Sequence, residues 1–189
     1  AKLFTNTWRY IKFSISNQFY MIAESKDLDF YKIKNAISKN YPRANDFPNA
    51  GFTAGPCLFK DTMQLAAYNR HNFSLGHSAM LINETLPNFV IDQAKKKTQL
   101  NGKKVGILGM AFKPNNDDKR ESLAYKLKKL LIYENANVSC TDPYINDNSF
   151  VPVDQLLEES EIIFIGCPHK EYENLKIKNS LVFNCWSEK

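Results

Sequence analysis

Apolar residues recur at helical spacing along the first part of the chain, from Lys2 to Ser38. They stand three or four positions apart, as on one side of an α-helix: Leu3, Phe4, Trp8, Ile11, Ile15, Phe19, Ile22, Ile33 and Ile37. We predict a long helix and a short helix, separated by a break at Asp27–Asp29. The apolar coverage of the first helix is wide, which favours a helix packed on two sides, as in a dimer core. A membrane-surface helix is the alternative.

Residues 39–56 hold three prolines, three asparagines and two glycines, and this composition predicts a loop. Helical spacing resumes at Asp61 and continues to about Thr98, with an interruption at residues 73–76. Pro87 lies inside this stretch, where it should kink the helix or mark a boundary. The first half of the chain is therefore predicted to be a helical bundle with one long loop.

After residues 99–102 the pattern changes to short continuous apolar runs that alternate with amphipathic segments. The runs predict strands at 105–110, 138–141, 162–166 and 181–185, with helices at 122–133 and 153–160. Strands that alternate with helices pair in parallel through right-handed crossovers. We therefore predict a mixed fold: an all-α domain at residues 1–100, then a small α/β doubly wound, Rossmann-like domain at 101–189. Ligands of such sheets bind beyond the carboxyl ends of the strands, here residues 109–122, 141–145 and 167–172.

The composition is that of a soluble globular protein, 43% hydrophobic and 24% charged. No apolar run approaches the roughly 18 residues of a membrane span, so we expect no membrane partner. The net charge of +5 is spread along the chain. A nucleic-acid-binding protein would more often gather such charge with aromatic residues on one surface, so we expect no nucleic-acid partner either.

Four cysteines, at positions 57, 140, 167 and 185, form no CxxC pair and show no metal-ligand spacing. The last three fall in or beside apolar runs, where a buried free thiol is the usual state. We expect no disulfide and a reducing compartment, the cytoplasm. The histidines at 71, 77 and 169 share no ligand spacing, so we expect no metal site.

The most informative segment for function is GFTAGPCLFKD at residues 51–61. A thiol is a nucleophile as the thiolate, and the nearby charge of Lys60 can lower the pKa of Cys57. A helix after the turn would bring Asp61, a candidate general base, to the same side as Cys57. Gly51 and Gly55 would let a ligand approach the backbone closely. This pattern indicates an acyl-transfer site, and a surface turn with a buried cysteine is the alternative.

The loop after the first predicted strand carries a second cluster. Lys113 and Arg120 flank a polar turn ahead of a helix, and two cations at a helix amino terminus suit a diphosphate. Asp117 and Asp118 are expected to be the helix cap and its neighbour. A capped surface loop without a ligand is the alternative. The strand itself contains no GxGxxG, so it lacks the dinucleotide fingerprint.

Three segments together carry a resemblance to a known family: GFTAGPCLFKD, VGILGMAFKPNNDDKRES and CTDPY. In this order they resemble the nucleotide-sugar 6-dehydrogenases, the UDP-glucose and UDP-N-acetylmannosamine dehydrogenase group. The resemblance covers essentially all 189 residues and matches the central helical dimerisation domain and the carboxyl-terminal nucleotide-sugar domain. It implies that the NAD-binding Rossmann domain of the family is missing from this chain. It also implies an oxidation of a sugar C6 alcohol to a carboxylate with two NAD, for cell-surface polysaccharide precursors.

The resemblance implies catalytic roles for residues that match the family motifs. Cys57 would form a thiohemiacetal and then a thioester with the oxidised sugar carbon. Asp61 would help to activate the water that hydrolyses this thioester. Lys2 and Asn6, in KLFTN, would stabilise the developing oxyanion.

Binding residues are implied in the same way. Arg43, in YPRAND, would reach the nucleotide sugar, often from the neighbouring subunit of a homodimer. Phe112 and Lys113 would hold the uridine nucleotide, and Arg120 would touch the NAD diphosphate. Ala54 stands where the family usually has the first of two paired glycines, which puts close ligand approach there in doubt.

Two readings from other classes remain beside the enzyme. The chain could be a binding module that holds a nucleotide sugar without chemistry, or a dimer scaffold with no nucleotide affinity. Binding of UDP distinguishes the scaffold from both of the other readings.

Overall fold

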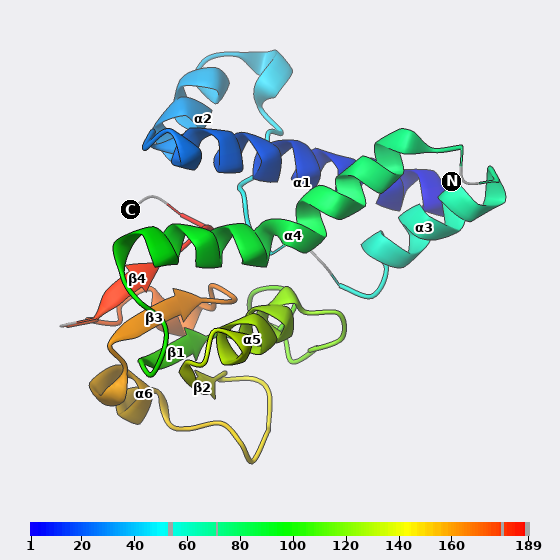
Figure 1. The fold of residues 1–189 in the computed structure, drawn as a ribbon. Coiled ribbons are helices and arrows are strands. Elements are labelled where there is room, and N and C mark those ends of the chain that lie inside the picture. Colours follow the sequence, from blue (N-terminus) through cyan, green and yellow to red (C-terminus); the bar gives the residue numbers. More distant parts are fainter. Residues whose placement is uncertain (53–54, 71, 179, 188–189) are drawn as a thin grey trace. The chain divides into compact units, whose positions relative to one another are not determined.

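The computed structural model describes residues 1–52, 55–70, 72–178 and 180–187. Its elements, in chain order, are α1 (Lys2–Ser25), α2 (Phe30–Ser38), the short 3-10 helix η1 (Pro42–Ala44), α3 (Leu58–Tyr68), α4 (Ser74–Lys97), β1 (Lys104–Leu108), α5 (Leu123–Tyr133), β2 (Asn137–Thr141), α6 (Val153–Glu159), β3 (Ile162–Ile165), the short η2 (Lys170–Tyr172) and β4 (Leu181–Phe183) (Figure 1). A helical half is followed by an α/β half, which confirms the predicted fold class.

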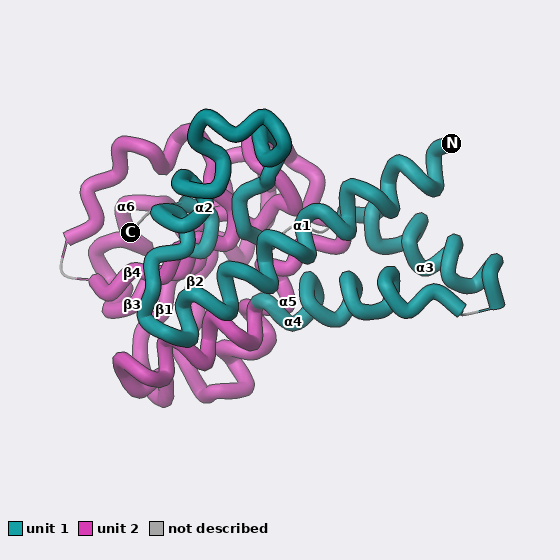
Figure 2. The backbone as a smooth tube through the Cα atoms, turned by 90° about the horizontal axis from the view of Figure 1, so that it is seen from above, with its two compact units in different colours: residues 1–86, 185–189 teal, residues 87–184 magenta. Residues whose placement is uncertain are grey.

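The chain forms two compact units, shown in different colours in Figure 2. Unit 1 contains Ala1–Leu86 together with the carboxyl-terminal residues from Cys185, and unit 2 contains Pro87–Asn184. The division falls at Pro87, inside α4, and the helix continues through the proline. Pro87 is therefore not a helix boundary, and the predicted kink stays a prediction. The domain ranges 1–100 and 101–189 stay a prediction.

Unit 1 is built around α1, with α3 beside its amino-terminal half and α2 at its carboxyl end (Figure 1). Tyr10 and Ile11 of α1 form a buried apolar cluster with Leu58 and Ala79. The break between α1 and α2 lies where the sequence predicts it. Oδ1 of Asp29 caps α2 there, because it accepts the backbone N–H groups of Tyr31 and Lys32.

Buried amide side chains hold the long loop of unit 1 against the helices. Asn17 of α1 accepts the N–H of Gly51 at 2.9 Å and donates to the Gly51 carbonyl at 3.1 Å. The same side chain donates to Oδ1 of Asn83 on α4 at 2.9 Å. This loop is therefore fixed just before the segment that leads to Cys57.

α3 begins at Leu58, three residues earlier than the predicted Asp61. Cys57 is the N-cap residue, and its carbonyl accepts the N–H of Asp61 at 2.9 Å as the first hydrogen bond of the helix. The cysteine turn is thus continuous with the helix, and Asp61 stands one full turn beyond Cys57.

The exposed side of α1 carries five large apolar side chains. At 100° per residue they fall within about 60° of arc, so they form a single stripe: Phe4, Trp8, Ile15, Phe19 and Ile22. Phe4 is 70% exposed and Trp8 is 58% exposed. Within one chain α1 is therefore packed on one side, and the predicted second packing side is an apolar surface. None of the helices in the described part of the chain combines the length and apolar character needed to cross a membrane.

Unit 2 contains a four-stranded parallel sheet in the order β2-β1-β3-β4. The four predicted strands are all present. A Cβ on Gly106 of β1 would meet Leu156 of α6, whereas a Cβ on Gly166 would meet both Ile107 of β1 and Ala124 of α5. The two helices therefore cover opposite faces of the sheet, as the doubly wound fold requires.

The strand order reverses between β1 and β3, since β2 lies on one side of β1 and β3 on the other. In doubly wound sheets the ligand crevice lies at this point, outside the carboxyl ends of the strands. Gly109 and Gly166 let the two strand ends approach closely there. A Cβ on Gly109, at φ 87°, would lie 2.2 Å from the Cys167 carbonyl oxygen, and one on Gly166 would lie 2.4 Å from the Gly109 oxygen.

The cap of α5 is Ser122, and the prediction that Asp117 and Asp118 form the cap is wrong. Glu121 has φ 54°, so the backbone becomes helical only after it. The Ser122 hydroxyl accepts the N–H of Ala124 at 3.3 Å and donates to the Ala111 carbonyl at 3.1 Å. One side chain therefore starts the helix and fastens the loop that follows β1.

Replacing Ser122 with alanine should destabilise α5 by about 1–2 kcal/mol, because both the cap and the bond to Ala111 are lost. Hydrogen exchange of the buried Leu127 and Leu131 amides measures this change. Ser25→Ala, at an exposed position at the end of α1, is the control and should change stability by less than about 0.5 kcal/mol. Exchange in Ser122→Ala equal to that of the parent would contradict the role of this cap.

Candidate functional site

The first cluster of chemical groups lies in unit 1 and joins α1 to α3. Cys57 is exposed, whereas Asp61, one turn later, is 2% exposed. Nδ2 of Asn6 on α1 donates a 2.7 Å hydrogen bond to Oδ2 of Asp61. The structure thus brings together three residues that the sequence assigned to one site, from segments more than fifty positions apart.

Asp61 is held as a carboxylate by its surroundings. The hydrogen bond from Asn6 is the main cause that lowers its pKa; burial opposes the change, and the charges of Lys60 and Lys2 assist it. Nζ of Lys60 lies 3.6 Å from Oδ1 of Asp61. Lys60 therefore pairs with the carboxylate. Lys2 is one turn before Asn6 on α1 and adds its charge to the same cluster.

Arg43 and the two glycines of the cysteine motif lie elsewhere in unit 1. Arg43 is exposed on η1, and the segment after it is fastened to the middle of α1 by an ion pair between Asp46 and Lys12 and a 2.7 Å bond from Ser16 to the Pro48 carbonyl. Lys12 lies about 9 Å along the helix from Asn6. Among the described residues, no hydrogen bond or ion pair joins Arg43 to Asp61.

Gly51 has a structural explanation of its own. A Cβ at this position would lie 2.3 Å from the Trp186 ring, so the missing side chain makes room for the indole. Gly55, at φ 100°, occupies a backbone conformation that favours glycine. Approach of a ligand to either glycine stays a prediction. Ala54 lies outside the described residues.

The other three cysteines are buried and free, as the sequence predicts. Burial raises the pKa of Cys140 to about 11, and of Cys167 and Cys185 to about 12. These thiols stay protonated near neutral pH and are inert. Cys57 is thus the exposed cysteine of the four.

The second cluster lies at the carboxyl edge of the sheet in unit 2. Lys113 is exposed and its Nζ lies 5.5 Å from the centre of the Phe112 ring, while Phe112 is half-buried. The backbone N–H of Phe112 donates to the Asp118 carbonyl at 3.0 Å, and this bond closes the loop. The predicted aromatic–lysine pair is therefore at the expected strand end, with the charged group in solvent.

The Arg120 guanidinium forms an ion pair with the Asp118 carboxylate of the same loop. Nε and Nη2 of the guanidinium donate to both carboxylate oxygens, at 2.6–3.1 Å. These bonds lower the pKa of Asp118 to about 2. The Arg120 side chain is 72% exposed, so its charge is presented to solvent in a fixed orientation.

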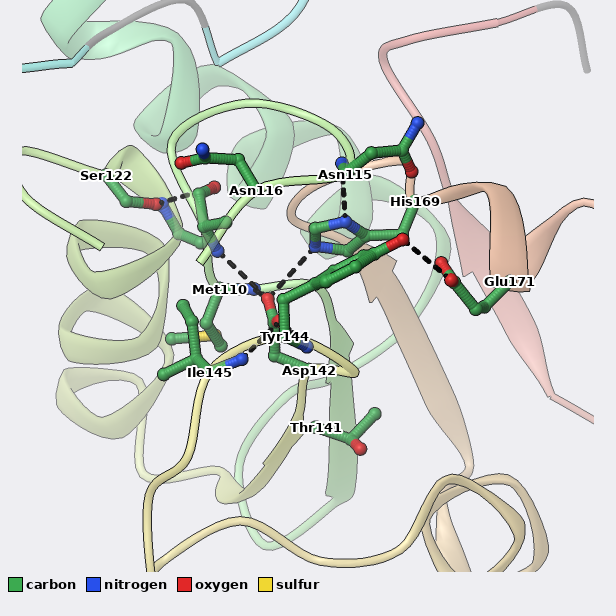
Figure 3. Close-up of polar contacts among 12 residues, drawn as sticks. Met110, Asn115, Asn116, Ser122, Thr141, Asp142, Tyr144, Ile145, His169 and Glu171 are labelled. Atoms are coloured by element: carbon green, nitrogen blue, oxygen red, sulfur yellow. Dashed lines mark hydrogen bonds and ion pairs between the residues drawn. The ribbon is translucent and has the colours of Figure 1, made fainter. Parts of the chain in front are cut away.

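Sequence reasoning missed two buried groups beside this loop, Asp142 and His169, which Figure 3 shows together. Both side chains have no exposed surface, and Nε2 of His169 lies 3.0 Å from Oδ2 of Asp142. Asp142 could have been found, because an Asp-Pro pair directly after a strand forms a side-chain-capped turn. His169 carried no signal beyond its place after β3.

Among the described residues of unit 2, surface hollows lie at the amino edge of the sheet. One has a volume of about 460 Å³ and is lined by residues such as Glu158, Glu161 and Lys178; the other, of about 310 Å³, includes Lys104 and Ser139. Neither contains residues from the carboxyl-edge loops. We give more weight to the carboxyl edge, because parallel sheets bind ligands there. The described residues contain no group of three or more histidine, cysteine or acidic side chains that could hold a metal; His71 lies outside the described residues.

Comparison with protein families agrees with this arrangement. Residues 1–85 match the central domain of the UDP-glucose/GDP-mannose dehydrogenase family, and residues 106–187 match its UDP binding domain. The chain belongs to the UDP-glucose/GDP-mannose dehydrogenase family.

Individual relatives carry names from the same group. A UDP-N-acetyl-D-mannosamine dehydrogenase of Methanocaldococcus jannaschii is 30% identical over 97% of this chain and 45% of its own length. A UDP-glucose 6-dehydrogenase of Bacillus subtilis is 27% identical over 86% of this chain and 38% of its own length. The solved structure of a UDP-glucose dehydrogenase from Pyrobaculum islandicum is 27% identical, has a TM-score of 0.86, and is matched over 100% of this chain and 47% of that one. The chain therefore spans about half the length of the relatives it matches.

Replacing Asn6 with alanine should lower the stability of unit 1 by about 1.5–3 kcal/mol at pH 7, because the Asp61 carboxylate loses a charge-assisted bond. The pKa of Asp61 is depressed in the folded state, so this contribution is present above its unfolded value, near 3.9, and is lost as the pH falls through the lower folded value. The difference between parent and variant should therefore shrink below about pH 4.

Denaturation followed by tryptophan fluorescence reports on this unit, since Trp8 and Trp186 both belong to it. Thr5→Ala, which changes an exposed neighbour on α1, is the control. A stability difference for Asn6→Ala that does not change between pH 7 and pH 2.5 would argue against an ionised Asp61.

Proposed function

We propose that this chain is the substrate-side portion of a nucleotide-sugar dehydrogenase that oxidises the C6 alcohol of a UDP-sugar to the uronic acid. The observation that carries the proposal is the exposed Cys57 thiol one helical turn from the buried, ionised Asp61. Family membership supports the same reaction class, and the names of the relatives agree with it. The product would serve as a precursor of cell-surface polysaccharides.

Unit 2 is proposed to bind the nucleotide. Lys113 presents its ammonium at the carboxyl edge of the sheet, next to the Phe112 ring. An ammonium suits a diphosphate, and an aromatic ring suits a pyrimidine base. The match of residues 106–187 to a UDP binding domain supports this assignment.

The cofactor is proposed to be NAD, which when bound accepts a hydride in each of two oxidations. Few residues of this chain are proposed to contact NAD. Gly106 and Gly109 face Leu156 and Cys167, so these glycines pack the sheet and cradle no diphosphate. Arg120, oriented by Asp118, is the residue proposed to meet the NAD diphosphate.

Cys57 supplies the covalent step. After the C6 alcohol has lost a hydride and a proton, the sulfur bonds to the aldehyde carbon and the oxygen takes up a proton, which gives a thiohemiacetal. Loss of a second hydride from this carbon and of the hydroxyl proton leaves a thioester. Water then adds to the carbonyl carbon, the carbon–sulfur bond breaks, and the acid and the Cys57 thiol are released.

The neighbours of Cys57 have defined tasks in this scheme. Asp61 takes a proton from the attacking water, which its low pKa permits because the carboxylate is ionised and ready to accept. Asn6 uses one N–H of its amide for Asp61, and the second can be donated to the developing oxyanion. Lys2 adds positive charge to the same cluster.

The apolar stripe on α1 supports a homodimer through the helical unit. Its five side chains would leave water if the same face of a second copy packed against them. The predicted reach of Arg43 into a neighbouring subunit fits this proposal, because no contact among the described residues joins Arg43 to the cysteine cluster of its own chain. Four free cysteines agree with a cytoplasmic protein.

The chain should bind UDP, and Lys113→Ala should weaken this binding by about 1–3 kcal/mol if the contact is charge-assisted. Isothermal titration calorimetry with UDP measures both. The control is Lys129→Ala, which removes an exposed lysine from α5 and should leave the affinity unchanged. Absence of UDP binding by the parent chain would leave the dimer scaffold as the better reading.

Cys57→Ser should abolish acid formation in an enzyme completed by an NAD-binding domain, and should leave the affinity for the UDP-sugar nearly intact. The product assay is mass spectrometry of the UDP-sugar acid. Cys140→Ser is the control, because this buried thiol lies in the other unit. Unchanged turnover in Cys57→Ser would eliminate the thioester mechanism, whereas a completed parent enzyme that binds the UDP-sugar but forms no acid would favour a binding module.

A further inference from the structure

A buried hydrogen-bond network joins the three loops at the carboxyl edge of the sheet. Asp142 follows β2, His169 follows β3, and Met110, Ala111 and Asn115 belong to the loop after β1. Figure 3 shows Asp142 and His169 pointing toward each other beneath this loop. The proposed chemistry uses neither side chain, although a buried carboxylate and imidazole are costly to keep without a purpose.

Asp142 is saturated with donors. Oδ2 accepts the N–H of Met110 at 2.6 Å and of Ala111 at 3.0 Å, and Oδ1 accepts the N–H of Tyr144 at 2.8 Å and of Ile145 at 3.1 Å. Burial alone would raise its pKa, but these bonds and the one with His169 outweigh burial and hold the pKa below its usual value. The carboxylate therefore fixes the start of the β1 loop to the β2 loop.

His169 continues this connection to the middle of the β1 loop. Its Nδ1 lies 2.9 Å from the backbone nitrogen of Asn115, which can only donate, so Nδ1 accepts. The ring proton of the neutral imidazole then stands on Nε2 and is donated to Asp142. The Asn115 side chain adds a second bond between the same two loops, because its Oδ1 accepts the backbone N–H of Lys170 at 3.0 Å.

Phe112 and Lys113 lie between these two anchors. Ala111 is tied to Asp142 on one side, Asn115 is tied to His169 on the other, and Asn115 is held at φ 55°. So short a segment, fixed at both ends, has few conformations left. Ordering it before the ligand arrives reduces the entropy cost of binding.

We propose that His169, oriented by Asp142, is a positioning residue for the nucleotide, acting through the bond from the Asn115 N–H to Nδ1. The inference rests on the proposed UDP site and adds to it a residue that makes no contact with the ligand. The bond to Nδ1 is the part that matters for affinity, since Asp142 keeps four backbone donors without the ring.

Two substitutions separate the two ring nitrogens. In His169→Asn the amide oxygen takes the place of Nδ1 and can accept from Asn115, whereas in His169→Gln the amide nitrogen takes the place of Nε2 and can donate to Asp142. Titration of UDP should show an affinity within about threefold of the parent for His169→Asn. His169→Gln should bind at least about tenfold more weakly, and exchange of the Asn115 amide should be faster in this variant alone.

The outcomes are distinguishable. If the parent binds UDP and His169→Gln binds it equally well, the positioning role is wrong and the UDP site stands. Equal losses in both variants would mean that the ring is needed for packing, and would also overturn the proposal. A parent that fails to bind UDP overturns the proposed function, and this inference with it.

Should His169→Gln fail to fold, Asn115→Gly, at an exposed position, tests whether the order of the segment between Ala111 and Asn115 sets the UDP affinity. Glycine tolerates φ 55° and keeps the N–H, but the bond from Lys170 is lost and the loop is freer. UDP affinity should fall about threefold or more. An unchanged affinity would overturn the proposal.

Discussion

A buried carboxylate whose oxygens are filled by donors from other segments is the constraint on which both clusters depend. Taking such a charge out of water is costly unless hydrogen bonds replace the lost solvation, so the chain must bring the donors to it. Asp142 gathers four backbone N–H groups and the imidazole of His169. Asp61 gathers the Asn6 amide across two helices. In each case the need of a buried carboxylate for hydrogen-bond donors brings particular loops or helices together.

In the proposed reaction the two units have different tasks. Unit 1 presents an exposed thiol beside an ionised carboxylate, and unit 2 presents a lysine and an aromatic ring on a loop closed by backbone bonds. The thiol and the lysine head are exposed, whereas the groups that orient their surroundings are buried. Reactive groups are thus accessible while their supports are excluded from solvent, the arrangement that preorganised sites require.

Helical spacing of apolar residues predicts the helices, which bury one apolar face, and continuous apolar runs predict the strands, because β1 and β3 are buried on both faces of the sheet. The cap of α5 was not predicted correctly from the sequence. Ser122 rather than Asp118 begins the helix, because Glu121 adopts a left-handed backbone conformation that the sequence pattern does not predict. The cysteine site was predictable because Cys57 and Asp61 share one helix. Asn6 was reached by motif resemblance alone, and His169 was missed because its partners come from two other loops.

The nucleotide is proposed to bind at the carboxyl edge, where the strand order reverses between β1 and β3. Amide chemical-shift mapping of the chain with UDP tests this proposal directly. The largest shifts should fall within residues 110–118 and 167–170. Shifts confined to the amino edge, at residues 158–161 and 176–178, would place the ligand in the hollow lined by Glu158 and Lys178 and would contradict it.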